Sequence, residues 1–376
     1  MIFQGTGYFI FIQTQNKAGK KPRMLRKRAL TLIVALFVVA GLYIFTRVSP
    51  RRAKDFVSAK HVAKRSFDLK GTAEFPRKVR LFVAVLTHAK RKPRRDAIRD
   101  SWFKECNNQA ICRFFSDEVG LSNQSRLKLA NEGLENKDVV LLPPTARLAF
   151  TERLLLVWEW VYQHNIQFDY FLRIDDDHFL CLGRLLYELK HRPLKGLYWG
   201  FLHCHPKVVR IDEAWLLLSA DLVEEVLARR RDKTLVCTPY GDQAVAIWIN
   251  QSKKNVTYFI DNKRIVHKSA GKDPSFFNKD ICEKYMSLHG TYPKSMRQFW
   301  LLWDNLRRRE SHVLSYQIPK IEDYSKHCAF SPVFDYTGFI SEYQFKPKLC
   351  HENPTWSVSG NMHAGREDDG ERYSNY

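Results

Sequence analysis

The sequence predicts one large α/β domain, and three features indicate it. The run Val79–Thr87 is rich in apolar and β-branched residues, as expected of a strand buried inside a sheet. Strand-like and helix-like runs then alternate along the chain as far as Trp248, which is typical of a sheet covered by helices. The apolar run Tyr170–Ile174 ends at three adjacent carboxylates, Asp175–Asp177.

Each expected element follows from its own pattern. In Arg94–Trp102 the apolar residues Ala97, Ile98 and Trp102 share one helical face, which predicts an amphipathic helix. The other expected strands are Ala110–Ser116, Asp138–Leu142, Tyr198–Leu202 and Glu213–Leu218. The other expected helices are Ser122–Glu135, Phe150–His164, Arg184–His191, a helix capped by Ser219 and running to Leu227, one after Asp242, and one that follows a loop within Asp280–Trp303.

An uncharged run of 18 residues, 29–46, precedes this domain. At helical rise it spans about 27 Å, enough for a bilayer core. We therefore expect a single-span signal-anchor. A cleaved signal peptide is the alternative, but the run is long for one, and no small-x-small site follows it before Arg47.

The sequence predicts five consecutive parts. They are a cytoplasmic tail at 1–28 with Met24 as an alternative start, the anchor at 29–46, a basic stem at 47–76, the α/β domain at 77–317, and an extension at 318–376. The extension lacks clear periodicity, and its end is expected to be disordered.

The net charge of +21 is concentrated at the N-terminal end of the chain. Residues 1–100 hold 24 of the 61 Lys and Arg but only 5 of the 40 Asp and Glu, so the remaining chain is close to neutral. A nucleic-acid-binding protein gathers its basic residues on a folded face. Here they flank the predicted anchor, so we expect anionic lipid headgroups and no nucleic acid as their partners.

The orientation of the anchor depends on features of the domain, because basic residues flank the anchor almost equally on both sides. The glycosylation acceptors at Asn123, Asn250 and Asn255 can be used only in a luminal domain. The eight cysteines permit disulfides in an oxidising lumen, and Cys106 and Cys112 are close enough for a local bridge. These features predict a luminal domain behind a type II anchor.

The acidic triplet is the leading candidate site. Three adjacent like charges repel one another, and a hard divalent cation such as Mg²⁺ or Mn²⁺ removes that repulsion while it bridges carboxylates to a diphosphate. The alternative is a solvated acidic turn or helix cap. Ligands of open α/β sheets bind outside the carboxyl ends of strands, where the triplet is expected to lie. This position favours a metal–diphosphate site.

Other polar residues have a structural and a functional interpretation. Arg94, Arg95 and Arg99 form either a solvated basic face of their helix or a face turned toward a nucleotide. Asp242 precedes an apolar helix, where it is either a charge on the helix dipole or a catalytic base. A lone histidine such as His289 is more often packed than a ligand.

Taken together, four blocks resemble the β1,3-galactosyltransferase family of Golgi glycosyltransferases, which also holds β1,3-N-acetylglucosaminyltransferases and the Fringe proteins. The blocks lie within Arg77–Trp303. They are Arg94–Trp102, similar to Arg-Arg-x-x-Ile-Arg-x-Thr-Trp; Arg173–Leu180, similar to Lys-x-Asp-Asp-Asp-x-Phe-Val; Leu218–Val223; and Leu288–Trp300, similar to Val-His-Arg-x-x-Pro-x-Glu-Met-x-x-Met-Trp.

The resemblance implies a GT-A fold, a Rossmann-like sheet that binds a UDP-sugar through Mn²⁺, and transfer with inversion, most simply of galactose. It implies a Golgi location and a glycan acceptor on a glycoprotein, glycolipid or proteoglycan. UDP-N-acetylhexosamine is the alternative donor.

The resemblance also assigns roles to single residues. Asp175 and Asp177 match the outer carboxylates of the metal motif, with Asp177 as the direct ligand, and His289 matches a late histidine that contacts metal or diphosphate; His267 is its reserve. Asp242 matches the base of Glu-Asp-Val. The residues expected to bind the nucleotide are Arg94, Arg95, Arg99, Asp175 and Asp176.

The chain departs from the family at two places. Gly241 replaces the glutamate of Glu-Asp-Val, and Arg210–Trp215 stands where the family has Tyr-Pro-x-Tyr and Gly-Gly-Tyr, so Asp212 and Glu213 are candidates for part of the sugar-binding role. These changes favour a rival interpretation, an anchored glycan-binding or chaperone-like protein without turnover. A luminal lectin-like protein is a third.

Overall fold

The computed structural model describes residues 78–118, 121–143, 150–205, 208–309, 316–322, 327–328 and 347–354. The predicted tail, anchor and stem lie outside the described residues, as does the chain after 354. Among the helices that are described, none combines the length and apolarity needed to cross a membrane. The anchor at 29–46 therefore stays a prediction.

A seven-stranded mixed sheet forms the centre of the domain, in the order β3-β2-β1-β4-β7-β6-β9. Its strands are β1 (Leu81–Leu86), β2 (Ala110–Asp117), β3 (Val139–Leu142), β4 (Tyr170–Asp175), β6 (Leu197–His205), β7 (Val208–Ser219) and β9 (Thr257–Ile260). The four strands β3, β2, β1 and β4 are parallel, β7 is antiparallel to β4 and β6, and β9 is parallel to β6. The predicted α/β class is confirmed, and β9 is a strand that the sequence did not predict.

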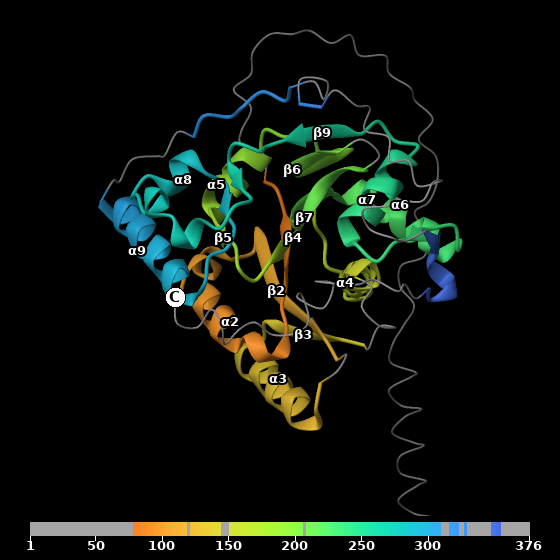
Figure 1. Ribbon diagram of the computed structural model, residues 1–376, viewed down its shortest axis with the longest axis horizontal. Helices are drawn as coiled ribbons and strands as arrows, with labels where there is room; N and C mark the ends of the chain where they lie inside the picture. Colours follow the sequence, from red (N-terminus) through yellow and green to blue (C-terminus); the bar gives the residue numbers. More distant parts are fainter. Residues whose placement is uncertain are drawn as a thin grey trace, which may run out of the picture. The chain divides into compact units, whose positions relative to one another are not determined.

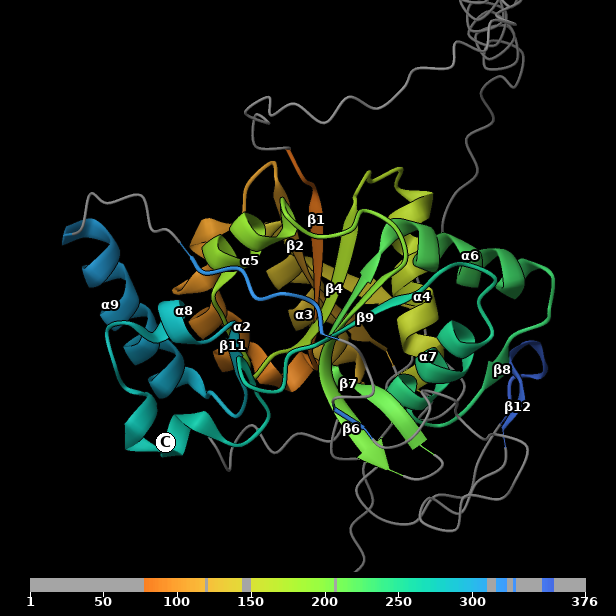
Figure 2. The ribbon, with the colours of Figure 1, turned by 90° about the horizontal axis from the view of Figure 1, so that it is seen from above.

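Helices cover both faces of this sheet, as two views at right angles show (Figure 1, Figure 2). One layer contains α2 (Lys92–Arg99), α5 (Leu182–Leu189), α8 (Ile281–Lys284) and α9 (Pro293–Arg309), and the other contains α4 (Phe150–Gln163), α6 (Ala220–Arg231) and α7 (Gly241–Asn250). Helix α3 (Asn123–Asn136) packs beside β3. Each layer buries its own apolar cluster against the sheet, so alternate residues of β1 and β4 face opposite cores.

Two smaller sheets complete the described fold. Strands β10 (Ile265–Val266), β11 (Ser287–Leu288) and β5 (Phe179–Leu180) form one, and β8 (Val236–Cys237) pairs with β12 (Lys348–Leu349) in the other. The first attaches the chain after the acidic triplet to the segment that carries the late histidine. Short 3-10 turns occur at Ala89–Arg91, Trp102–Glu105, Ala270–Lys272, Pro274–Phe276 and Cys350–Glu352.

The predicted boundaries are accurate where burial defines them. Helix α2 begins earlier than predicted, at Lys92, because Pro93 occupies its first turn. Strand β7 begins at Val208, well before the predicted Glu213. Ser219 precedes α6 as predicted, but its hydroxyl does not cap that helix; it donates to Asp221 and accepts the Leu197 N–H.

All eight cysteines form disulfides, and the predicted Cys106–Cys112 bridge is confirmed. Cys181 bridges to Cys282, which links the segment after the triplet to α8. The last two bridges join Cys204 to Cys328 and Cys237 to Cys350. Two positions of the predicted extension are therefore covalently attached to the domain.

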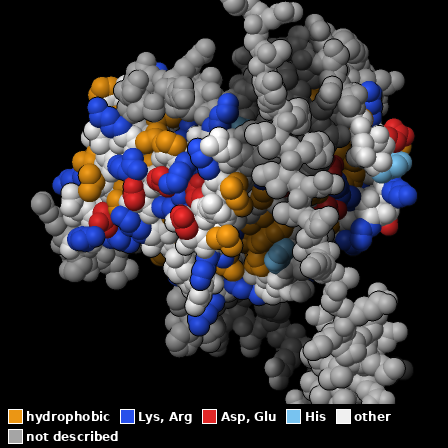
Figure 3. Space-filling model, turned by 90° about the horizontal axis from the view of Figure 1, so that it is seen from below, with side chains coloured by type: hydrophobic (Ala, Val, Ile, Leu, Met, Phe, Trp, Pro, Cys, Tyr) orange, Lys and Arg blue, Asp and Glu red, His pale blue; other side chains and the backbone are white. Residues whose placement is uncertain are grey.

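The face drawn in Figure 3 carries basic and acidic side chains that are interspersed. This arrangement agrees with the near-neutral charge of the chain after residue 100.

Candidate active site

The acidic triplet lies where the order of the parallel strands reverses. The chain runs from β1 outward through β2 and β3, then returns to β4 on the other side of β1. Leu86, the last residue of β1, is in register with Asp175 of β4. The triplet and Thr87 therefore share the carboxyl edge of the sheet at its switch point, the usual ligand-binding position in such folds.

The three carboxylates occupy different environments. Asp175 is a third exposed and pairs with Arg173, its Oδ1 lying 3.0 Å from Nη2. Asp176 is fully buried and accepts hydrogen bonds from Thr87 Oγ1 at 2.7 Å and from Arg94 Nη1 at 2.9 Å. Asp177 has a buried Oδ1 that forms no hydrogen bond with any described residue. Of the three carboxylates, Asp177 is the one with a buried oxygen that lacks a hydrogen-bond partner within the described part of the chain.

The charges around the triplet shift the pKa values in opposite directions. Burial by itself would raise the pKa of Asp176, but Arg91 and Arg94 outweigh burial and lower it, which keeps this carboxylate ionised. Asp175 has a raised pKa because its partial burial and the two neighbouring carboxylates outweigh Arg173. Asp176 thus has the environment of a structural ion pair.

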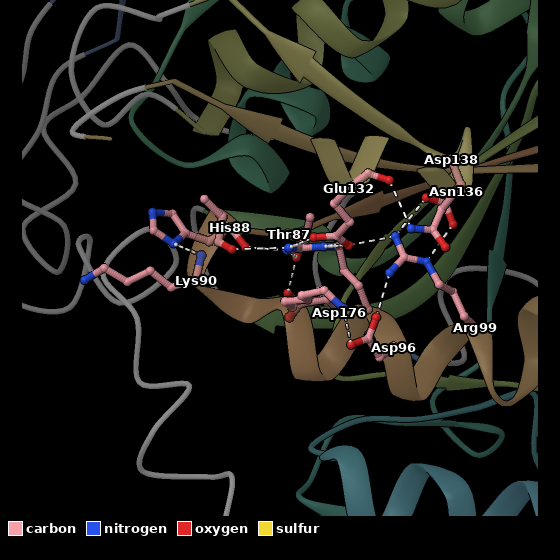
Figure 4. Close-up of polar contacts among 12 residues, drawn as sticks. Thr87, His88, Lys90, Asp96, Arg99, Glu132, Asn136, Asp138 and Asp176 are labelled. Carbon is pink, nitrogen blue, oxygen red and sulfur yellow. Dashed lines mark hydrogen bonds and ion pairs between the residues drawn. The ribbon is translucent and has the colours of Figure 1, made fainter. Parts of the chain in front are cut away.

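The three predicted nucleotide-binding arginines are engaged with the protein itself. Arg95 is fully buried and holds both oxygens of Glu132, at 2.8 and 2.7 Å. Arg99 contacts Asp96, Glu132 and Asp138, as Figure 4 shows. Arg94 lies against Asp176 and above the ring of Tyr292, 5.0 Å from its centroid.

The structure shows which protein groups three of the predicted nucleotide-binding residues contact. Arg95 and Arg99 link α2 to α3 and to Asp138 before β3, and Asp176 links the end of β4 to Arg94 of α2. Their role in nucleotide binding stays a prediction. Arg94 alone approaches an oxygen of Asp177, at 3.7 Å from Oδ2. An amphipathic pattern identifies the basic positions of a helix, but it cannot show that an acidic partner 37 residues later faces them.

The predicted late histidine lies beside the triplet. Nε2 of His289 is 3.7 Å from Oδ1 of Asp177, and Nδ1 donates to the backbone oxygen of His267 at 2.7 Å. A carbonyl oxygen can only accept, so in the neutral ring Nε2 carries the lone pair. Gly290 follows at φ +65°, and a Cβ there would lie 2.5 Å from Ser269 Oγ, so only glycine fits this turn.

His178 also belongs to this group, although the sequence analysis did not select it. A ligand atom of Asp177, one of His178 and one of His289 all lie within 4.8 Å of one another. His178 is 1% exposed, and its Nε2 has no hydrogen-bond partner among the described residues. Burial lowers the pKa of this imidazole well below its usual value, so the ring is neutral. Its position directly after the triplet was the available signal.

A second group lies on the β6–β7 hairpin and the segment after β10. His203 Nε2 is 2.6 Å from Asp212 Oδ2, and His267 Nδ1 is 3.5 Å from the same oxygen. Asp212 Oδ1 accepts the Ala214 N–H at 2.7 Å. These carboxylate oxygens already have partners, unlike Oδ1 of Asp177.

The predicted base Asp242 is joined to the triplet through charged neighbours. Arg173, which pairs with Asp175, also donates to the backbone oxygen of Glu213. The Glu213 carboxyl accepts the Asp242 N–H at 3.2 Å, and Arg210 contacts the Asp242 carboxylate. Burial raises the pKa of Asp242 against the opposing effect of Arg210. The structure therefore brings Asp242 and the triplet into one electrostatic cluster.

The substitution of the family's glycines has a structural explanation. The indole of Trp215 is 1% exposed and packs edge-on against Trp199, with 5.5 Å between ring centroids. It points into the core rather than toward Asp242. Arg210, Asp212 and Glu213 are the hairpin residues whose side chains border the cluster.

Glu213 is expected to make stability depend on pH. Burial, together with Asp242, Asp175 and Asp212, raises its pKa from 4.5 to about 8 despite Arg173. A raised carboxyl pKa means that the folded chain holds the proton more tightly, so this stability is complete below pH 4.5 and is lost as pH rises through 8. Glu213→Gln should therefore increase Tm at pH 8.5 and change it little at pH 4.5.

The measurement is a thermal melt of each variant across this pH range. Glu283→Gln, at an exposed position, is the matched control and should follow the wild type throughout. An equal Tm difference between Glu213→Gln and wild type at both pH values would contradict the raised pKa.

Comparison with known proteins identifies galactosyltransferases as relatives. No protein-family model matches the chain. Over 140 residues it is 29% identical to beta-1,3-galactosyltransferase 6 of Mus musculus, covering 35% of this chain and 43% of that protein. Over 257 residues it is 23% identical to hydroxyproline O-galactosyltransferase GALT5 of Arabidopsis thaliana, covering 61% of this chain and 36% of that protein.

Two solved structures overlap with part of the fold. One is the mannosyltransferase PcManGT from Pyrobaculum calidifontis in complex with GDP-Man and Mn²⁺, at 12% identity and a TM-score of 0.33, covering 53% of this chain and 59% of that one. The other is an active-site mutant of LgtC, at 12% identity and a TM-score of 0.34, covering 55% and 86%. The α/β fold class of this chain is established by its own seven-stranded sheet and the helices that cover it.

The resemblance to galactosyltransferases is thus confirmed by the two curated relatives. The matches span less than half the length of either relative.

Proposed function

We propose that the chain is a GT-A glycosyltransferase that moves a hexose, most simply galactose, from a UDP-sugar to a glycan hydroxyl with inversion and β1,3 linkage. The observation that carries this proposal is the triplet at the switch point, where Oδ1 of Asp177 is buried without a hydrogen bond to any described residue and lies beside imidazole nitrogens. The adjacent Asp175 is linked through Arg173 and Glu213 to Asp242. The galactosyltransferase relatives support the choice of sugar. UDP-N-acetylhexosamine is the alternative donor.

Asp177 and His289 fit a divalent cation. Oδ1 of Asp177 is buried without a hydrogen bond to any described residue, and Nε2 of His289, which carries the lone pair when the ring is neutral, lies 3.7 Å from it. Mn²⁺ accepts both kinds of ligand. A bound ion would supply Lewis-acid neutralisation of the diphosphate as UDP leaves. Asp175, predicted as a second ligand, is paired with Arg173 and on this proposal fixes that guanidinium.

Asp242 is the proposed base. Its raised pKa suits the removal of a proton from an acceptor hydroxyl near neutral pH, and Arg210 keeps the carboxylate oriented. Its position at the start of α7 fixes the backbone, since its own Oδ1 accepts the Gln243 N–H at 2.8 Å.

We expect the purified full-length chain to hydrolyse or transfer from one member of a UDP-sugar panel only when Mn²⁺ is present. Asp242→Asn should lower kcat by about 10²–10⁴-fold, the usual contribution of a general base. Its affinity for UDP with Mn²⁺, measured by calorimetry, should remain that of the wild type, because the substitution leaves the triplet intact. Wild-type turnover in Asp242→Asn would exclude this residue as the base.

A second candidate function follows if Arg210 neutralises the Asp242 carboxylate instead of orienting it as a base. If that ion pair persists with ligand bound, the chain is a binding or chaperone-like protein without turnover. UDP binding in the presence of Mn²⁺ without transfer to any acceptor would support this alternative. Glycan binding that needs no nucleotide would instead indicate a lectin-like protein.

The proposed compartment is the Golgi lumen, behind a type II anchor at 29–46. Four disulfides that use every cysteine are typical of an oxidising compartment. The glycosylation acceptors Asn123 and Asn255 are exposed on the folded domain. These features support a luminal domain.

A further inference from the structure

His178 contributes an unused, buried nitrogen to the candidate metal group. Its Nε2 and the Oδ1 of Asp177 are both buried, and neither forms a hydrogen bond within the described part of the chain. A buried polar atom without a partner destabilises the folded chain. Two such atoms on adjacent residues, turned toward a third ligand on His289, indicate that a bound species satisfies them together.

The hydrogen bonds of His178 fix which nitrogen holds the lone pair. Nδ1 lies 2.9 Å from Ser287 Oγ, and that hydroxyl donates to the Phe179 oxygen at 3.2 Å. The hydroxyl proton is thereby engaged, so Ser287 accepts from Nδ1–H. The lone pair of the ring therefore lies on Nε2.

His289 is arranged in the same way. Its Nδ1–H is fixed by the His267 oxygen, and its ring centroid lies 4.8 Å from that of His178. In each ring Nδ1 is therefore hydrogen-bonded to an oxygen and the lone pair lies on Nε2, and one ligand atom of each ring lies within 4.8 Å of the other. This anchoring is typical of metal-binding histidines.

The spacing is close to that of ligands sharing an ion. Two ligand atoms that each lie about 2.0–2.2 Å from one metal are at most about 4.4 Å apart. The three atoms here lie within 4.8 Å of one another. Oδ1 of Asp177 and Nε2 of His289, 3.7 Å apart, already lie within that limit, so closing the group around an ion mainly requires the His178 nitrogen to approach them.

We propose that His178 is a third protein ligand, so that the site has two histidines and one carboxylate and selects Mn²⁺ or another transition-metal ion over Mg²⁺. Imidazole nitrogen suits transition metals, whereas Mg²⁺ prefers oxygen ligands. This inference rests on the proposed function for the location of the site, but its test measures metal binding alone.

The first measurement needs no variant. The full-length chain is freed of metal with a chelator and loaded with one equivalent of Mn²⁺, and nitrogen couplings are recorded by pulsed electron paramagnetic resonance. Two coupled imidazole nitrogens are expected. A single coupled nitrogen would overturn the assignment of His178.

Variants then test selectivity. In competition titrations that follow free Mn²⁺, the wild type should retain Mn²⁺ against an equal concentration of Mg²⁺. His178→Gln should bind Mn²⁺ at least 10-fold more weakly, since losing even an outer-shell partner costs 10–100-fold, and should lose one nitrogen coupling. Unchanged affinity and selectivity in His178→Gln would overturn the proposal.

Two further variants separate ligation from packing. Ser287→Ala removes the hydrogen-bond partner of Nδ1 but keeps the His178 ring, and it should weaken Mn²⁺ binding without removing a nitrogen coupling. His203→Gln, in the second group, is the matched control and should leave both nitrogen couplings intact. Two nitrogens without turnover of any UDP-sugar would refute the proposed function alone, and turnover with one nitrogen would refute this inference alone.

Discussion

Asp177→Asn is expected to abolish metal-dependent transfer while leaving the fold as stable as the wild type or more stable. The carboxylate charge would be lost from the one member of the triplet whose Oδ1 has no hydrogen bond. Losing several kcal/mol of charge stabilisation corresponds to a fall of at least about 10³-fold in kcat/KM. Without the ion, the same substitution removes one of three neighbouring negative charges, so repulsion within the triplet decreases.

Two measurements check this result, turnover of the UDP-sugar with Mn²⁺ and a thermal melt in the presence of chelator. Asp100→Asn is the control, because Asp100 forms an exposed ion pair with Arg297, a type of contact that contributes little. Turnover close to wild type in Asp177→Asn would contradict the site. A large loss of stability would instead show that Asp177 has a structural role.

The parts of the fold that the sequence predicted well are those determined by burial. Strands β1 and β4 lie between two helical layers, so nearly every residue in them is apolar, and the runs are visible in the sequence. Strand β7 was predicted too short because its first half carries Arg210 and Asp212, whose side chains serve the site rather than the core. The apolar–polar alternation that identifies a strand is therefore hard to recognise where polar side chains of the strand contact the candidate site.

The site was predicted in outline for a similar reason. The acidic triplet stands out because adjacent like charges need an explanation within a few residues. The partners that give each carboxylate its own role, Thr87 and Arg94 for Asp176 and His289 for Asp177, come from other elements. No local pattern distinguishes the buried middle carboxylate from the outer ones. For the same reason, the sequence could not show that Arg95 and Arg99 form ion pairs with Glu132.

Asp176→Asn, one residue before Asp177, is expected to destabilise the fold, unlike Asp177→Asn. Asp176 is fully buried, and its charge is shared by Arg91 and Arg94, with Nη1 atoms at 3.3 and 2.9 Å. Removing one member of a buried ion pair costs about 3–5 kcal/mol, because the remaining charge stays desolvated. The amide is nearly isosteric with the carboxylate and can still accept from Thr87, so the loss is electrostatic rather than steric.

Chemical denaturation measures this cost directly, and Asp177→Asn is the matched control because it is the same substitution on the adjacent residue. We expect the free energy of unfolding to fall by about 3–5 kcal/mol in Asp176→Asn and to stay level or rise in Asp177→Asn. Equal stabilities for the two variants would contradict the assignment of a structural role to Asp176 and a metal-binding role to Asp177. The difference follows from placement, since the middle carboxylate faces the arginines of the 3-10 turn and α2 whereas Oδ1 of its neighbour faces two imidazoles. The end of β4 is thus followed by a carboxylate that stabilises the fold, Asp176, and by the proposed metal ligand, Asp177.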